Sequence, residues 1–158
     1  MKTILKKIPL YESFDFNTEE DENFDSIIES HRYKKFLKDN YDIKGAQVRP
    51  YKKDGILFID IDGDVIVKNL IIKSLTNGQF QFGEVKGNFD CHSCDSLKTL
   101  EGAPSKVGMD FDCHECKSLI SLEGAPREVV GSFTCRGCHS LKSIDLPATT
   151  KIFGTIYK

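Results

Sequence analysis

The sequence of 158 residues lacks any apolar run that approaches the ~20 residues of a membrane-spanning helix. Residues 1–9 include lysines, as the start of a secretory leader does, but no apolar segment follows them. We therefore expect no membrane partner and a cytoplasmic location. Six cysteines in that reducing compartment stay as thiols, which argues against a framework of disulfides.

Neither sign of charge dominates, because 22 lysines and arginines offset 24 acidic residues and leave a formal net charge of -2. The chain has no basic stripe with interleaved aromatic residues, so nucleic acid is a disfavoured partner. Glycine-rich phosphate loops, a Ser-His-Asp order and His-x-x-x-His pairs are absent as well. The sequence thus predicts that the protein is not an enzyme and holds no cofactor.

What the chain does contain is a repeat of 22 residues, marked by Cys-x-x-Cys pairs that begin at Cys91, Cys113 and Cys135. Apolar positions recur at the same spacing, and these are Val85, Val107 and Val129; Phe89, Phe111 and Phe133; Leu97, Leu119 and Leu141; and Leu100, Leu122 and Ile144. A metal site requires only its ligands to recur. A solenoid requires the whole inward-facing set to recur, because every coil packs on its neighbour in the same way. The repeat therefore predicts a short parallel β-solenoid.

Residues 1–62 precede the repeat, and we predict that they form an N-terminal arm, a helix and a β-hairpin that cap the solenoid of residues 63–158. Thr18 and Asp21 have the spacing of a helix-capping pattern. The apolar residues that follow recur at helical spacing, with acidic residues first and lysines last. The pattern predicts a helix over residues 18–40.

A hairpin is predicted next, because residues 46–51 and 56–61 are two apolar segments on either side of a turn signal, Asp54-Gly55. Pro50 lacks a backbone N–H and confines the first of these strands to the edge of a sheet. Together with the repeat, these elements place the fold in the α+β class, as a solenoid of about 22 residues per coil with a helix and hairpin cap.

The repeat unit reads Gly-x-Phe-x-Cys-x-x-Cys-x-Ser-Leu-x-x-Leu-Glu-Gly-Ala-Pro. Over residues 63–154 the chain resembles leucine-rich repeats, whose strand pattern admits cysteine at the turn after the strand. The stretch 138–147 is similar to short cysteine-type bacterial leucine-rich repeats, and the Leu-Glu-Gly-Ala-Pro unit is similar to repeat proteins encoded by tailed bacteriophages. Because Gly-Ala-Pro replaces the helix of leucine-rich repeats, we expect turns there and a thin, rather straight solenoid.

The cysteines have two interpretations. If the coils stack in register, the cysteines form two buried columns and behave as small apolar side chains. The alternative is zinc, because Cys-x2-Cys-x18-Cys-x2-Cys lies within the spacing range of four-cysteine sites. The ligands would come from Cys91, Cys94, Cys113, Cys116, Cys135 and Cys138. Packing is the preferred interpretation, because the first cysteine of each pair lies two residues after a core phenylalanine and one pair is left over.

The residues that alternate with the core positions are predicted to form an exposed strand face. These residues are Asn88, Asp90, His92, Asp110, Asp112, His114, Glu115, Thr134 and Arg136. The register places Asp90 beside Asp112 and His92 beside His114. Solenoids use such extended faces to bind partners, so we take these residues as the candidate partner-binding site. Aspartate and histidine also bind metals and transfer protons, but no nucleophile accompanies them.

The preferred hypothesis is a non-enzymatic protein–protein interaction module. The resemblance to bacteriophage repeat proteins implies a phage accessory protein that acts in the host cytoplasm, where it binds and inhibits a host protein of defence or replication. The alternatives are a zinc-binding Cys-x-x-Cys module, structural or associated with nucleic acid, and a component of the virion. An exposed edge strand at the C-terminal end of the solenoid also predicts self-association into a homo-oligomer.

Overall fold

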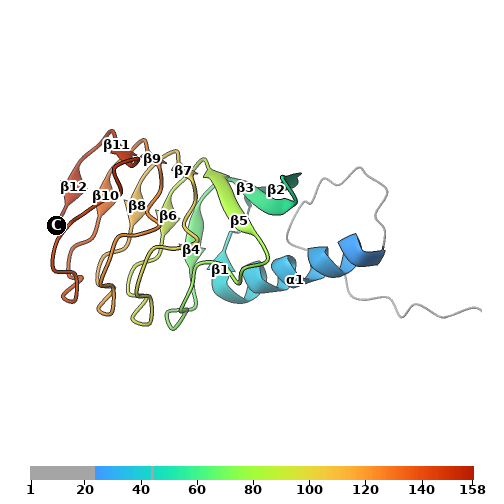
Figure 1. Ribbon diagram of the computed structural model, residues 1–158, viewed down its shortest axis with the longest axis horizontal. Coiled ribbons are helices and arrows are strands. Elements are labelled where there is room, and N and C mark those ends of the chain that lie inside the picture. The colour runs from blue at the N-terminus through green and yellow to red at the C-terminus, as the bar shows by residue number, and fades with distance from the viewer. Residues whose placement is uncertain (1–23, 44) are drawn as a thin grey trace, which may run out of the picture.

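The computed structural model describes residues 24–43 and 45–158, so the predictions for the arm of residues 1–17 and for Thr18 lie outside the described residues. Figure 1 shows a helix followed by a stack of coils. The elements are α1 (Phe24–Asn40), β1 (Tyr41–Asp42), β2 (Gln47–Lys53), β3 (Ile56–Asp62), β4 (Val65–Val67), β5 (Gln81–Val85), β6 (Phe89–Asp90), β7 (Lys106–Val107), β8 (Phe111–Asp112), β9 (Glu128–Val129), β10 (Phe133–Thr134), β11 (Lys151–Ile152) and β12 (Ile156–Tyr157).

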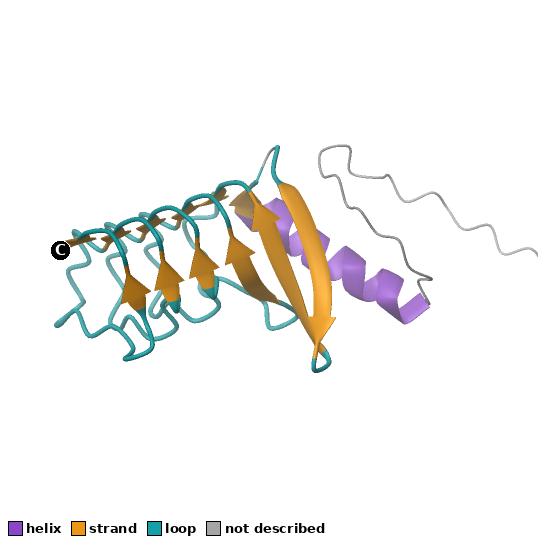
Figure 2. Cartoon of the chain, turned by 90° about the horizontal axis from the view of Figure 1, so that it is seen from above, coloured by secondary structure: helices purple, strands orange, loops and turns teal. Residues whose placement is uncertain are grey.

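The coils carry two sheets rather than one. The first sheet has the order β1-β4-β6-β8-β10-β12, and the second has the order β2-β3-β5-β7-β9-β11 (Figures 1 and 2). Within the solenoid every pair of neighbouring strands is parallel and in register, so that Phe89 pairs with Phe111 and Phe111 with Phe133. The predicted solenoid of the α+β class is confirmed.

The second sheet is not predicted by the sequence. Its strands β7, β9 and β11 are two residues long, which is too short to show the alternation by which a strand is recognised. The coil length is also less uniform than the repeat implies. Val65 pairs with Phe89 and Phe133 with Ile156, so the first and last steps are 24 and 23 residues.

The predicted hairpin is confirmed. Strands β2 and β3 are antiparallel, and Lys53 pairs with Ile56 across a two-residue turn. Asp54 and Gly55 in that turn have φ angles of 52° and 77°, and positive φ at both central residues is the requirement of a type I′ turn. Strand β2, which carries Pro50, is the outermost strand of the second sheet, as the missing N–H requires.

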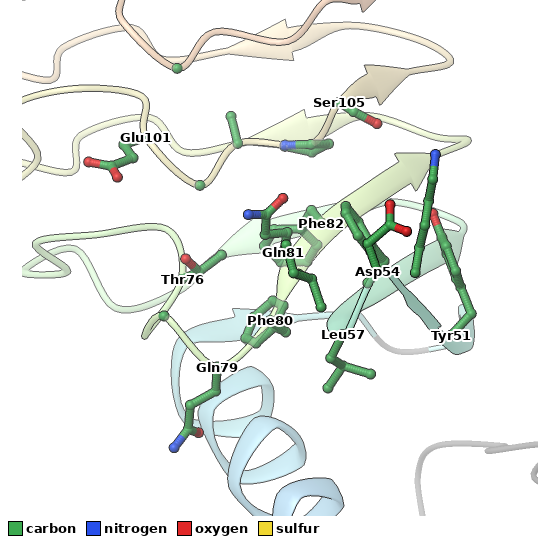
Figure 3. Close-up of a pocket in the computed structure, with 18 of the residues that line it drawn as sticks. Tyr51, Asp54, Leu57, Thr76, Gln79, Phe80, Gln81, Phe82, Glu101 and Ser105 are labelled. Carbon is green, nitrogen blue, oxygen red and sulfur yellow. The ribbon is translucent and has the colours of Figure 1, made fainter.

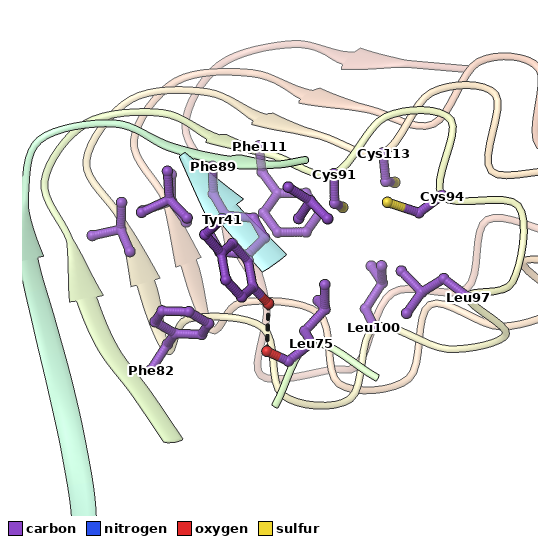
Figure 4. Close-up of a cluster of buried hydrophobic side chains, with 14 of the residues drawn as sticks. Tyr41, Leu75, Phe82, Phe89, Cys91, Cys94, Leu97, Leu100, Phe111 and Cys113 are labelled. Carbon is purple, nitrogen blue, oxygen red and sulfur yellow. Dashed lines mark hydrogen bonds between the residues drawn. The ribbon is translucent and has the colours of Figure 1, made fainter. Parts of the chain in front are cut away.

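The cap and the coils share one hydrophobic core. From α1, Tyr33 and Leu37 are buried, so the described part of the predicted helix packs as expected. Tyr41 of β1 is 2% exposed and its hydroxyl donates a hydrogen bond of 2.5 Å to the carbonyl oxygen of Leu75 (Figure 4). Strand β3 of the hairpin pairs with β5 of the solenoid, so the second sheet continues over the predicted boundary at residue 62. The division into a cap and a solenoid at that residue stays a prediction.

Phenylalanine side chains form the centre of the solenoid core. The rings of Phe89 and Phe111 stack with centroids 5.5 Å apart, and those of Phe111 and Phe133 with centroids 5.2 Å apart. All three side chains are fully buried. Stacking of identical rings follows directly from the parallel register, because each ring lies above its counterpart in the next coil.

The segments that contain Gly-Ala-Pro are turns, as predicted, and residues 63–158, all of which the structure describes, contain no helix. Gly102 and Gly124 have φ angles of 87° and 82°, a left-handed conformation that favours glycine. Within the described residues, no helix has the length and apolar character needed to cross a membrane.

Candidate functional site

The predicted strand face is the outer surface of the first sheet. Two Asp-x-His pairs lie on it at the same position of successive coils. The Oδ1 atom of Asp90 accepts hydrogen bonds from the backbone N–H of His92 at 3.0 Å and from its Nδ1 at 2.6 Å. Asp112 makes the same two bonds with His114, at 2.9 and 2.8 Å. We call the outward surface formed by Asp90, His92, Asp112, His114, Thr134 and Arg136 the dyad face.

The two dyads lie side by side, as the register predicts. Asp90 pairs with Asp112, and the two imidazole rings stack with centroids 4.9 Å apart and planes within 7°. An ionised carboxylate only accepts hydrogen bonds, so Nδ1 carries a proton, and in the neutral form of the imidazole ring Nε2 then carries a lone pair. The side chains of His92 and His114 are 39% and 36% exposed. The dyads therefore present acceptors to solvent: the imidazole Nε2 atoms and the second carboxylate oxygens.

This geometry does not assemble a metal site. Parallel imidazole rings point their lone pairs in the same direction, whereas ligands of one ion must converge on it. Among residues 24–43 and 45–158, no group of three or more His, Cys, Asp or Glu side chains has the arrangement that holds a metal ion.

The next coil replaces the dyad with Thr134 and Arg136. Thr134 pairs with Asp112, and the Arg136 guanidinium lies 4.9 Å from the ring centroid of Tyr157 in β12. Ile66 in β4 and Tyr157, 42% and 39% exposed, occupy the same row at the two ends of the face. The sequence pattern did not predict that Ile66 and Tyr157 flank the dyad face. The spacing along the chain could have indicated it, because Ile66 precedes Asp90 by 24 residues and Tyr157 follows Thr134 by 23, close to the period of the repeat.

Asn88 and Asp110 differ from the rest of the predicted site because their side chains bind the backbone of neighbouring coils. Their side chains belong to a ladder in which each coil accepts a backbone N–H from the next one. Asp64 Oδ1 accepts from the N–H of Asn88 at 2.7 Å, Asn88 Oδ1 from that of Asp110 at 3.0 Å, and Asp110 Oδ1 from that of Ser132 at 2.7 Å. This ladder joins the coils, so we assign the oxygens of Asn88 and Asp110 to the scaffold.

Glu115 lies in the turn after the second dyad. Its side chain is exposed and its φ angle is 56°, a left-handed conformation that a residue with a Cβ rarely adopts. Ser93 has a φ of 55° at the same position of the preceding coil, and the next coil has Gly137 there. This turn directs the chain away from the strand immediately after each histidine.

The cysteines form the two buried columns that the register predicts. Thiol hydrogen bonds link the two columns: Cys116 Sγ donates to the carbonyl oxygen of Cys91 at 3.1 Å, and Cys138 Sγ to that of Cys113 at 3.0 Å. A hydrogen bond with Cys116, together with burial, raises the pKa of Cys91 well above the usual range of a thiol. A hydrogen bond with Cys138 and burial do the same to the pKa of Cys113. Zinc binds thiolates, so this arrangement favours packing.

The second sheet differs from the dyad face because it carries carboxylates that pair with lysine or arginine within the chain. These pairs form the networks Arg49–Asp62–Lys86 and Glu84–Lys106–Glu128. The hydrogen bond from Lys86 lowers the pKa of Asp62, and the hydrogen bond to Glu128 raises the pKa of Lys106. Oppositely charged neighbours in register stabilise a sheet, whereas like charges in register, as in the two dyads, destabilise it.

A groove of about 970 Å³ lies beside the hairpin of the second sheet (Figure 3). It is lined by the hairpin strands, by the segment that leads into β5 and by the first Gly-Ala-Pro turns. The rings of Tyr51 and Phe58 on this sheet stack with centroids 5.5 Å apart. The lining charges, which include Lys53, Asp54 and Glu101, are of both signs. The groove therefore favours no single class of ligand.

A scan against protein-family models gave no match, and searches of curated proteins and of solved structures gave no match either. The repeat solenoid is thus established by the structure. The resemblance to leucine-rich repeats and to bacteriophage repeat proteins rests on the residue pattern alone.

Proposed function

We propose that the protein is a non-enzymatic interaction module that binds another protein through the dyad face. One observation supports this proposal above the others. The carboxylates of Asp90 and Asp112 lie in register on adjacent strands, and among the described residues neither has a lysine or arginine partner within 4.0 Å. Like charges at the ~4.8 Å separation of neighbouring strands are unfavourable unless a ligand compensates them.

The chemistry of the face specifies the kind of partner. Asp90 and Asp112 each keep one carboxylate oxygen that no hydrogen bond among the described residues uses, and the Nε2 atoms beside them are acceptors in the neutral ring. A surface rich in hydrogen-bond acceptors requires donors on the partner. The guanidinium group of arginine has several coplanar N–H donors, which bind both oxygens of a carboxylate, and it also stacks on aromatic rings. Ile66 and Tyr157 at the two ends add apolar contact area. The partner is therefore a protein surface that carries arginine between apolar residues.

The biological setting rests on the resemblance alone. The Leu-Glu-Gly-Ala-Pro unit is similar to repeat proteins of tailed bacteriophages, and we extend the proposal to a phage accessory protein that inhibits a host protein of defence or replication in the cytoplasm. Inhibition requires only that the dyad face cover a functional surface of that host protein. No chemistry on this chain is needed for it.

The test compares two matched double variants. Asp90→Asn with Asp112→Asn removes both charges of the dyad face and keeps the shape of the side chains. Glu101→Gln with Glu123→Gln removes two exposed charges that lie 22 residues apart, outside the strands of both sheets, and serves as the control. A protein captured from bacterial lysate is purified, and its affinity for each form is measured by calorimetry. The proposal predicts that the first variant loses affinity and the control does not, and equal affinity of all three forms would refute it.

A further inference from the structure

The outer face of the second sheet carries a row of charges that alternates in sign. Strands β5, β7, β9 and β11 lie side by side (Figure 2), and the pairing register places Glu84 beside Lys106, Lys106 beside Glu128, and Glu128 beside Lys151. Neighbours in this row are about 4.8 Å apart, the separation of adjacent strands. The order along the row is thus acidic, basic, acidic, basic.

A row of this order is complementary to itself when it is reversed. A two-fold axis that lies in the interface plane, parallel to the strands and between β7 and β9, brings the outer faces of two copies together and reverses the order of the row. Lys106 of one copy then lies opposite Glu128 of the other, and Glu84 lies opposite Lys151. Every charge meets its opposite, and the equal spacing of the strands on both copies keeps all four pairs aligned. Closed two-fold contacts of this kind are the commonest mode of association of identical chains.

Two exposed apolar side chains follow the strands that carry the charged row. Val130 follows β9 and Phe153 follows β11, and these side chains are 45% and 68% exposed. A contact that covers them adds burial of apolar surface to the pairing of the charges.

We infer that the outer face of the second sheet is an interface for a second copy of this chain, arranged about a two-fold axis between β7 and β9. The inference does not depend on the dyad face, which lies on the other sheet and stays accessible in the dimer. It is also distinct from self-association through the edge strand β12, because no edge strand takes part. The contact extends over four short strands, so we expect a weak dimer with a dissociation constant in the micromolar range or above.

Charge exchange tests the inference without a partner of unknown identity. Lys106→Glu puts like charges opposite each other in a homodimer, and so does Glu128→Lys. A mixture of the two variants restores four opposite pairs, because the new carboxylate of one chain meets the new ammonium group of the other. The double variant Lys106→Glu with Glu128→Lys restores them within a homodimer. The side chains concerned are 42% and 36% exposed, so both exchanges leave the core unchanged.

The measurement is sedimentation equilibrium on the full chain over micromolar to millimolar concentration, with circular dichroism to verify folding. We expect dimers of the wild type, about tenfold or more weaker association of each single variant alone, and recovery in the mixture and in the double variant. Glu84→Lys and Lys151→Glu form a second matched pair if one of the first variants fails to fold. A wild type that stays monomeric, single variants that associate as the wild type does, or a mixture without recovery would overturn the inference.

Discussion

Replacing Phe111 by alanine is the sharpest test of the stacked core. The side chain is fully buried in a middle coil, and its ring stacks on Phe89 on one side and Phe133 on the other. Loss of a buried phenylalanine costs about 3–5 kcal/mol through lost transfer energy and the cavity left behind. Each lost stacking contact adds ~0.5–1.5 kcal/mol. Both neighbours are held by their own coils and cannot close the gap, so we expect a loss of about 5 kcal/mol.

The assay is urea unfolding followed by far-ultraviolet circular dichroism, with the free energy taken from the midpoint and the slope. Ile120→Ala is the control, because that side chain is 59% exposed and its loss should change the free energy of unfolding by less than about 0.5 kcal/mol. Phe111→Leu keeps most of the volume and should lose less than Phe111→Ala. If Phe111→Ala unfolds within about 1 kcal/mol of the wild type at an unchanged slope, the ring stack does not exist as described.

Other predictions concern the turns and the thiols. Glu115→Gly should stabilise the protein by about 1 kcal/mol, because a φ of 56° strains any residue with a Cβ, and Gly137→Ala should destabilise it by a similar amount in thermal unfolding. A thiol reagent at neutral pH should leave all six cysteines of the folded protein unmodified and react with six in urea, because every cysteine is buried and reduced. The pKa of Cys135 is raised to about 11, chiefly by burial, and that of Cys138 also stands at about 11. A raised pKa in the folded state means that the unfolded thiol ionises first, so stability in urea titrations should fall between about pH 9 and pH 11. Elemental mass spectrometry should find no zinc, and a chelator should leave the melting temperature unchanged; one tightly held zinc per chain would contradict the packed columns.

Local chemistry was sufficient to predict the elements that a few residues determine. Asp54-Gly55 predicts the hairpin because only certain residues tolerate positive φ, and Pro50 predicts the edge because it lacks an N–H. The 22-residue period predicts the parallel register, and through it the neighbouring places of Asp90 and Asp112. These inferences succeed because a period or a turn is a property of the chain that requires no knowledge of distant contacts.

The second sheet and the roles of single polar residues required the tertiary structure. Asn88 and Asp110 alternate with core positions just as Asp90 and Asp112 do, yet the corner of the coil brings their oxygens to backbone N–H groups of neighbouring coils. The pattern of alternation predicts which side chains point away from the core, but not which of them form hydrogen bonds with neighbouring coils. That depends on the path of the chain between the sheets.

The residue pattern is enough to specify a stack of coils with a helix and a hairpin at one end, because identical inward-facing residues can be buried only against one another. The pattern does not specify which outward charges find a partner, because that depends on the folded chain. On the second sheet, Lys106 lies between Glu84 and Glu128 and the charges offset one another. On the first sheet, the same stacking places two carboxylates together and orients a histidine on each. The physical reason is that stacking in register repeats every feature of a coil on its neighbour, whether the result is a complementary pair or a repulsive one.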